Sequence, residues 1–234
     1  MSYLYIFLGV FIIACLALLA WAWTSSSTST STWSWGSTKD VAPSVSGATT
    51  LLSGTMDGMK SQVSSGDLPR SVNQEHGITF SYSCWILIND FTVNYGTKRI
   101  IFSKDDCPGL YLDTTSNALL FAVNTYGAKQ TILIDNIPAG KWLHVALVVD
   151  QEAVDIYIDG TLKERNTLVQ LPKQNTSPVT MGSSWDGVLA NLYYYPRAIS
   201  SSEVQILSSL VPTAPANTKA TRADFDATWY TGRV

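Results

Sequence analysis

Few residues of this sequence could take part in catalysis, and they are scattered along the chain. Hydrolysis of a glycosidic bond needs two carboxylates that flank one cleft, roughly 5–10 Å apart. The nearest pattern is "DQEAVD", from Asp150 to Asp155, but its acids bracket a predicted turn between two strands. A carboxylate at the tip of such a turn has no partner across a cleft. We therefore expect no catalytic residues, and the sequence predicts a protein that is not an enzyme.

The two histidines also do not form a recognisable catalytic or metal-binding site. His144 lies within the apolar run "WLHVAL", and His76 is the only other imidazole in the chain. A buried, hydrogen-bonded His144 beside Trp142 is the simpler interpretation. Zinc requires several His or Cys ligands in register, and the sequence does not supply them. Cys84 and Cys107 could form a disulfide, but we expect two buried thiols.

Carboxylates in predicted loops are candidate ligands for a calcium ion. Asp105 and Asp106 lie together in one predicted loop, and Asp186 lies in another, within "SSWDG". Their hard oxygen atoms suit Ca²⁺, although solvated aspartates in turns have the same composition. No complete ligand set can be mapped onto the sequence. Apart from this candidate calcium, we predict no cofactor.

Three aromatic residues in predicted loops are candidates for contact with a glycan or a protein partner. Sugar-binding sites stack a sugar ring on an exposed aromatic side chain and add a few polar contacts. Trp185, Tyr95 and Tyr126 could serve in this way. Packing in the core or ordinary exposure in a turn explains each of them equally well.

A β-sheet must position these residues, because short strand-like runs dominate the middle of the chain. The first runs, rich in β-branched and aromatic residues, occupy residues 79–88, 99–104, 109–114, 118–124 and 130–135. Turn residues separate them about every 8–12 positions, as in sandwiches and barrels. One short helix is expected before Pro212, where Ser200 and Glu203 form a capping box.

The stretch "VDIYIDGTLKE" predicts a hairpin, and its charges choose between two registers. A two-residue turn at 159–160 would place Asp155 opposite Glu164, a like-charge pair that lowers stability. A three-residue loop would place Asp155 opposite Lys163, with Gly160 in the left-handed conformation that it tolerates. We expect the second register.

The N-terminal segment, residues 1–23, is predicted to be a transmembrane anchor. Residues 3–23 carry no charge, and as a helix they would measure about 31 Å, the thickness of a bilayer core. Tyrosines lie at one end and tryptophans at the other, as at membrane interfaces. A cleaved signal peptide is the alternative, but no Lys or Arg precedes the run. Residues 24–74 are expected to form a Ser/Thr-rich tether and an irregular segment with one or two short strands.

The C-terminal tail, residues 212–234, ends in a cluster of aromatic residues. Phe225, Trp229 and Tyr230 lose several kcal/mol of burial if they stay in water. The tail has too few apolar residues to form a core of its own. We expect these side chains to dock on a partner or on the membrane-proximal face of the domain, and an added edge strand is the alternative.

Three motifs in order give the chain a resemblance to a known family. They are "FSYSCWILI" (80–88), "KWLHVALVVDQEAVDIYIDG" (141–160) and "WDGVLANLYYYPRAISSSEV" (185–204). Together they resemble the laminin G and pentraxin-like branch of the concanavalin A-like lectin/glucanase superfamily. The resemblance covers a domain at about 75–211 and implies an all-β fold, an antiparallel two-sheet jelly-roll sandwich with one short C-terminal helix. The superfamily includes glucanases, lectins, calcium-dependent binders and structural modules, so the fold does not choose a function.

Charge and composition narrow the choice of function. The net charge is −3 and no Lys/Arg run occurs, so we expect no nucleic-acid partner. Membrane-anchored domains resembling this one occur in virions of large DNA viruses with an internal membrane, and on cell surfaces. The first hypothesis is therefore a single-pass membrane protein of the virion, a minor capsid component that links the bilayer to structural or capsid proteins. The alternative is a glycan-binding, lectin-like adhesion protein at the cell surface.

Overall fold

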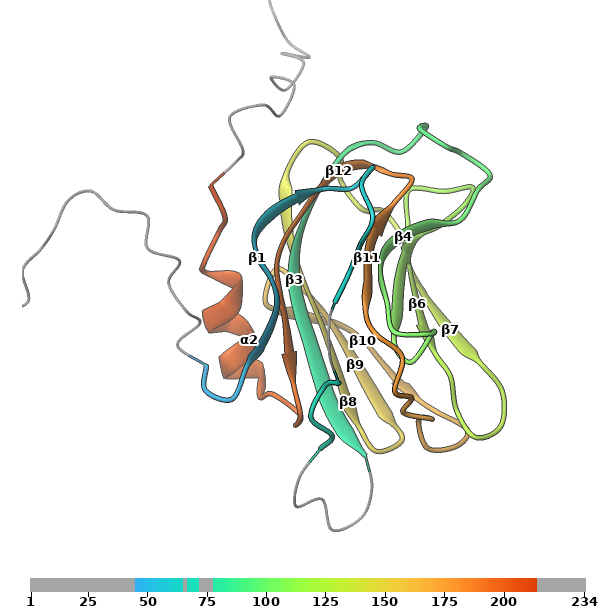
Figure 1. Ribbon diagram of the computed structural model, residues 1–234, viewed down its shortest axis with the longest axis vertical. Helices are drawn as coiled ribbons and strands as arrows, with labels where there is room; N and C mark the ends of the chain where they lie inside the picture. Colours follow the sequence, from blue (N-terminus) through green and yellow to red (C-terminus); the bar gives the residue numbers. More distant parts are fainter. Residues whose placement is uncertain (1–44, 65–66, 72–77, 214–234) are drawn as a thin grey trace, which may run out of the picture. The chain divides into compact units, whose positions relative to one another are not determined.

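The computed structural model describes residues 45–64, 67–71 and 78–213. Its elements are β1 (Thr49–Asp57), β2 (Gln62–Val63), β3 (Thr79–Asp90), β4 (Arg99–Ser103), β5 (Gly109–Leu112), β6 (Leu119–Val123), β7 (Gln130–Ile134), β8 (Trp142–Asp150), β9 (Ala153–Ile158), β10 (Thr161–Thr167), β11 (Thr180–Ser183), β12 (Asp186–Tyr195) and the helix α2 (Ser201–Ser208). One six-stranded sheet has the order β1-β12-β3-β8-β9-β10, and the other has the order β2-β11-β4-β5-β6-β7. The two sheets face each other (Figure 1). The prediction of an all-β, antiparallel two-sheet sandwich with one short C-terminal helix is confirmed.

The two ends of the chain fall outside this description. The predicted anchor at residues 3–23 is among the residues that are not described, and so are Phe225, Trp229 and Tyr230 of the tail. Among the residues that are described, no helix is long and apolar enough to cross a bilayer.

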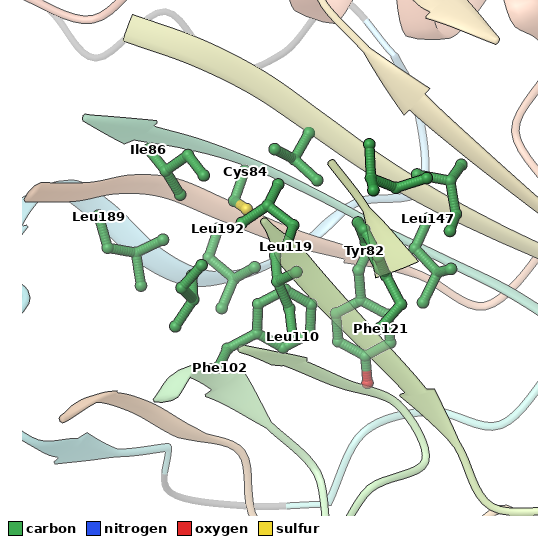
Figure 2. Close-up of a cluster of buried hydrophobic side chains, with 14 of the residues drawn as sticks. Tyr82, Cys84, Ile86, Phe102, Leu110, Leu119, Phe121, Leu147, Leu189 and Leu192 are labelled. Carbon is green, nitrogen blue, oxygen red and sulfur yellow. The ribbon is translucent and has the colours of Figure 1, made fainter. Parts of the chain in front are cut away.

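Strand β3 is the centre of the first sheet. Its residues from Thr79 to Ile88 are all buried, because β12 and β8 flank the strand and both of its faces are covered. Tyr82, Cys84 and Ile86 point into the core between the sheets, as Figure 2 shows. The Tyr82 ring stacks on Phe102 of the second sheet with centroids 5.3 Å apart, so aromatic packing joins the two layers.

The helix α2 covers the outer face of the first sheet. Val204 and Leu207 of the helix are buried against a second apolar cluster that includes Tyr195 and Tyr157. The predicted capping box is present: Ser200 and Glu203 satisfy each other's backbone N–H groups. Such a cap stabilises a helix by about 1 kcal/mol, and it fixes where α2 begins.

Strand β1 extends the sandwich toward the N-terminus, beyond the boundary expected at residue 75. It pairs with β12 from Thr49 opposite Tyr194 to Asp57 opposite Val188. Two register shifts interrupt the pairing, and Gly54, within the second of them, has a positive φ of 76°. These bulges break the alternation of apolar and polar residues that marks a strand in sequence. A nine-residue edge strand therefore looked like an irregular segment.

The hairpin of β9 and β10 differs from the expected register. Its loop is a two-residue turn, in which the residues at 159 and 160 both have positive φ, 48° and 77°. A bulge between Leu162 and Glu164 then adds one residue to β10 and brings Arg165 opposite Asp155. The Arg165 guanidinium donates two hydrogen bonds of 2.5 Å to the Asp155 carboxylate. The predicted pairing of Asp155 with Lys163 is wrong, because the bulge avoids the like-charge pair without lengthening the loop.

Candidate functional site

The predicted contact residues lie at opposite ends of the sandwich. Since neighbouring strands are antiparallel, successive loops alternate between the two ends. The Arg99 end carries the loops 91–98 and 113–118 and the short turn between β11 and β12. The Lys104 end carries the loops 104–108, 124–129 and 168–179, at the bottom of the view in Figure 1. Tyr95, Trp185 and Asp186 belong to the Arg99 end, whereas Asp105, Asp106 and Tyr126 belong to the Lys104 end.

The Arg99 end is organised by a buried guanidinium. Arg99 is fully buried and donates hydrogen bonds to the main-chain carbonyls of Phe91 and Asp113. The hydroxyl of Tyr95 donates to the carbonyl of Thr115 at 2.8 Å, so it joins the same two loops. The Tyr95 ring remains 58% exposed.

Trp185 is not a contact residue, because its side chain is fully buried in the core. The indole lies between two glycines that leave room for it. A Cβ atom on Gly58 or on Gly187 would come within 2.4 Å of the ring. Asp186, which follows it, accepts a hydrogen bond from the Asn89 side chain at 3.0 Å. The expectation that Trp185 stacks on a sugar is therefore wrong, and the residue belongs to the scaffold.

At the Lys104 end, main-chain hydrogen bonds lock three loops together. Asn124 N–H donates to the Asp106 carbonyl at 2.7 Å, and Lys173 N–H donates to the Asn124 carbonyl at 2.8 Å. Tyr126 N–H donates to the Leu171 carbonyl at 3.1 Å. The Tyr126 side chain is 65% exposed. An exposed aromatic ring thus stands on a backbone that is held in place.

The three candidate calcium ligands are not brought together. Asp106 forms an ion pair with Lys129 at 3.2 Å and accepts a hydrogen bond from the Tyr111 hydroxyl. Partial burial opposes ionisation, but these two hydrogen bonds hold the pKa of Asp106 below its ordinary value. Asp186 lies at the other end of the sandwich, away from Asp105. Within the described ranges, no group of three or more His, Cys, Asp or Glu side chains is arranged to hold a metal ion.

A hollow at the Lys104 end contains a feature that the sequence did not point to. Arg70, Tyr82, Lys104 and Gln174 are among the residues that line it. Lys104 is only 8% exposed, and its ammonium donates to both oxygens of Asn175 and to the Ser177 carbonyl. In the sequence, the only indication of this buried lysine is its position at the end of the apolar run "RIIFSK". Lysine is rarely buried without a partner, so such a position suggests that its ammonium is bound by other groups.

The structure also pairs His144 with Ser83 on the neighbouring strand. Nε2 of His144 and Oγ of Ser83 are 2.9 Å apart and share a hydrogen bond in the protein interior. The imidazole is buried, as predicted, and its ring lies beside the Trp85 ring of the neighbouring strand, at 5.2 Å between centroids. Burial lowers the pKa of His144 to about 4.

This Ser–His pair lacks what activates a serine nucleophile. In a catalytic triad a carboxylate accepts a hydrogen bond from Nδ1 of the histidine. Here Asp159 instead accepts one from the main-chain N–H of His144, at 2.9 Å. Nδ1 has no hydrogen-bond partner in the described part of the chain. An imidazole with a pKa of about 4 is also a poor general base at neutral pH.

The two cysteines of the domain are buried and free, as predicted. Burial raises the pKa of Cys107 to about 12, and that of Cys84 still further. Thiols of this kind are protonated at neutral pH and inert. They contribute packing rather than redox chemistry.

Two facing antiparallel six-stranded sheets define the class of the fold, an all-β sandwich. Within that class, the chain belongs to the concanavalin A-like lectin/glucanases superfamily. The profile of its Laminin_G_3 family matches residues 57–205. A comparison with curated proteins found no match.

Solved structures share the fold. The binding domain of botulinum neurotoxin serotype D has a TM-score of 0.51 and 14% identity, over 69% of this chain and 42% of that one. A variant of the domain named HCR/D has a TM-score of 0.54 and 13% identity, over 66% of this chain and 42% of that one. The chain thus spans less than half of either structure, and at this identity the likeness shows the fold alone.

Proposed function

We propose that this protein is a membrane-tethered, non-enzymatic recognition module that binds glycans at the Lys104 end of its sandwich. The observation that carries the proposal is Tyr126, an exposed ring held on an interlocked backbone next to polar loops. A ring that is already positioned loses little conformational entropy when it binds. Stacking on its face suits the C–H surface of a sugar, and nearby amide and charged groups suit the hydroxyls. Membership of a superfamily that includes lectins supports the same choice.

Replacing Tyr126 with alanine is expected to weaken glycan binding about tenfold or more, which corresponds to about 1.4 kcal/mol. The measurement is binding of the purified full-length protein to a glycan array, followed by titration with the best ligand. Tyr95→Ala is the matched control, because it removes a ring of similar exposure at the opposite end. We expect this control to bind like the parent.

Two outcomes would contradict the proposal. If Tyr95→Ala loses binding while Tyr126→Ala keeps it, the site lies at the Arg99 end. If the parent protein binds no glycan on the array, the glycan function itself is wrong.

A structural role is the second candidate function, and an exposed apolar strip favours it. Ile206 of α2 is 44% exposed, and Leu210 and Val211, which follow the helix, are 36% and 59% exposed. Leu162 is 43% exposed and pairs with Tyr157, so it points to the face that carries α2. Such a strip is suited to a protein contact. In this role the module would link a bilayer to the protein shell of a virion, whereas the glycan-binding role fits a cell or virion surface.

Both roles rest on the proposed membrane tether. The uncharged run at residues 3–23 predicts that the protein stays with membranes through an alkaline carbonate wash. The measurement is the distribution of intact protein between pellet and supernatant, with a peripheral membrane protein as the control that is released. Recovery of the intact chain in the supernatant would rule out the tether.

A further inference from the structure

We propose that the hollow at the Lys104 end is a subsite for an anionic group, a carboxylate or a sulfate, carried by the ligand. The inference rests on the proposed function for the glycan that carries this group. Its physical basis is the balance of charges and donors around the hollow.

The positive charge of Lys104 is solvated by the protein but not neutralised. The ammonium meets three oxygen atoms, all of them neutral, from Asn175 and Ser177. In the described part of the chain, no carboxylate lies within ion-pair distance of it. Asp67 and Asp105 act on it only through space. Carbonyl dipoles satisfy the N–H donors, but a unit charge remains in a poorly polarisable environment, where burial disfavours it.

A second cation faces the same hollow. Arg70 lines it together with Lys104. Burial is the main cause that lowers the pKa of Lys104, and repulsion by Arg70 acts in the same direction, although attraction by Asp67 has a larger effect than this repulsion and raises the pKa. Two like charges around one hollow destabilise each other. An anion between them would reverse both penalties, since it attracts each cation and compensates for their mutual repulsion.

The hollow also offers a hydrogen-bond donor. The Tyr82 side chain lines the hollow, and burial raises the pKa of its hydroxyl well above the ordinary value, so it keeps its proton. Figure 2 shows its oxygen pointing away from the labelled apolar side chains. Gln174 contributes an amide to the lining. The donors and charges thus match an oxyanion, not a neutral hydroxyl.

The size of the hollow limits what enters it. Its volume is about 20 Å³. A chemical group about the size of one or two water molecules fits in this space, and a sugar ring does not. A carboxylate or sulfate substituent fits this description if the sugar that bears it stays on the surface. This arrangement places the ring of the glycan among the loops that carry Tyr126.

The experiment titrates the full-length protein with sodium glucuronate, sodium sulfate and glucose at matched ionic strength. The readout is the NMR chemical shift of the side-chain amides of Gln174 and Asn175. We expect saturable shifts with glucuronate and sulfate and none with glucose. Arg70→Gln should weaken glucuronate binding about fivefold, the factor for one partly exposed charge pair. Lys163→Gln, on the exposed strand β10, is the matched control and should leave binding unchanged.

Equal shifts with glucose and glucuronate, or binding that survives Arg70→Gln unaltered, would overturn the anion subsite. Lys104→Met is the second variant, and we expect it to lose glucuronate binding. The fold of this variant is checked separately, so that a loss of binding is not mistaken for unfolding. Failure here and failure of the glycan function can be told apart. Array binding to neutral glycans that depends on Tyr126 but not on Arg70 would keep the function and reject the subsite. Glucuronate binding that depends on Arg70, without any glycan captured on the array, would keep the anion subsite and reject the glycan function.

Discussion

Replacing Trp185 with alanine is expected to lower the free energy of unfolding by about 3–5 kcal/mol, the range for removing a large buried aromatic side chain. The indole is fully buried, and it fills a space that Gly58 and Gly187 leave open. Backbone on both sides prevents the site from collapsing around a methyl group, so the cavity remains. Urea unfolding of the full-length protein, followed by tryptophan fluorescence, measures the change.

The matched control is Tyr126→Ala, which removes an exposed ring. Substitutions at exposed positions usually change stability by less than about 0.5 kcal/mol. Trp185→Ala would also lower glycan binding at temperatures where the variant unfolds, and the loss should disappear on cooling below its transition. A Trp185→Ala protein as stable as the parent, yet unable to bind glycans, would contradict the buried position.

The framework of the sandwich follows from local patterns in the sequence. The β-branched and aromatic residues of the run from Phe80 to Ile88 predict a strand. The structure places this strand, β3, inside the first sheet with both faces covered. The capping box at Ser200 and Glu203 predicts where the helix begins, because both partners lie within one turn. Signals of this kind involve neighbours in the chain, so no tertiary information is needed to interpret them.

The burial of Trp185, which was predicted wrongly, and the burial of Lys104, which was not predicted, both depend on contacts between distant residues. Trp185 precedes "DG", which is typical of an exposed turn, but its burial depends on Gly58, far away in the sequence. Similarly, Lys104 meets its partners 71 and 73 positions later, at Asn175 and Ser177. Nothing in the local pattern of either residue indicates these partners.

The hairpin shows a different limit. The rule that opposite charges pair across strands held, since Asp155 does face a cation. Two hairpin geometries place a cation opposite Asp155. A three-residue loop would pair it with Lys163, and a two-residue turn followed by a bulge pairs it with Arg165. The sequence contains both Lys163 and Arg165, so charge alone does not choose. The planar guanidinium binds a carboxylate with two hydrogen bonds, which favours the bulge that selects Arg165.

The stability of the domain is expected to fall as the pH is lowered from about 6.5 to about 4, because His144 is buried in its neutral form. The pKa of His144 is about 4 in the folded protein, and an unfolded histidine has a pKa near 6.5. Between these values the unfolded chain binds a proton that the folded chain excludes. The free energy of unfolding is therefore complete above pH 6.5 and falls by roughly 3 kcal/mol on reaching pH 4.

Urea unfolding at a series of pH values from 7.5 to 4.0, with His144→Gln as the control, isolates this contribution. Glutamine retains a hydrogen-bonding group next to Ser83 but does not titrate, so most of the slope between pH 6.5 and 4.5 should vanish in the variant. Carboxylates contribute below this window: Arg197 holds the pKa of Glu203 at about 2, so that pair loses its effect only as the pH falls through about 4.5 and lower. Equal slopes in the parent and in His144→Gln would show that the imidazole takes up its proton without unfolding. The Ser83–His144 pair would then be open to water in the native state, and the buried position of His144 would be wrong.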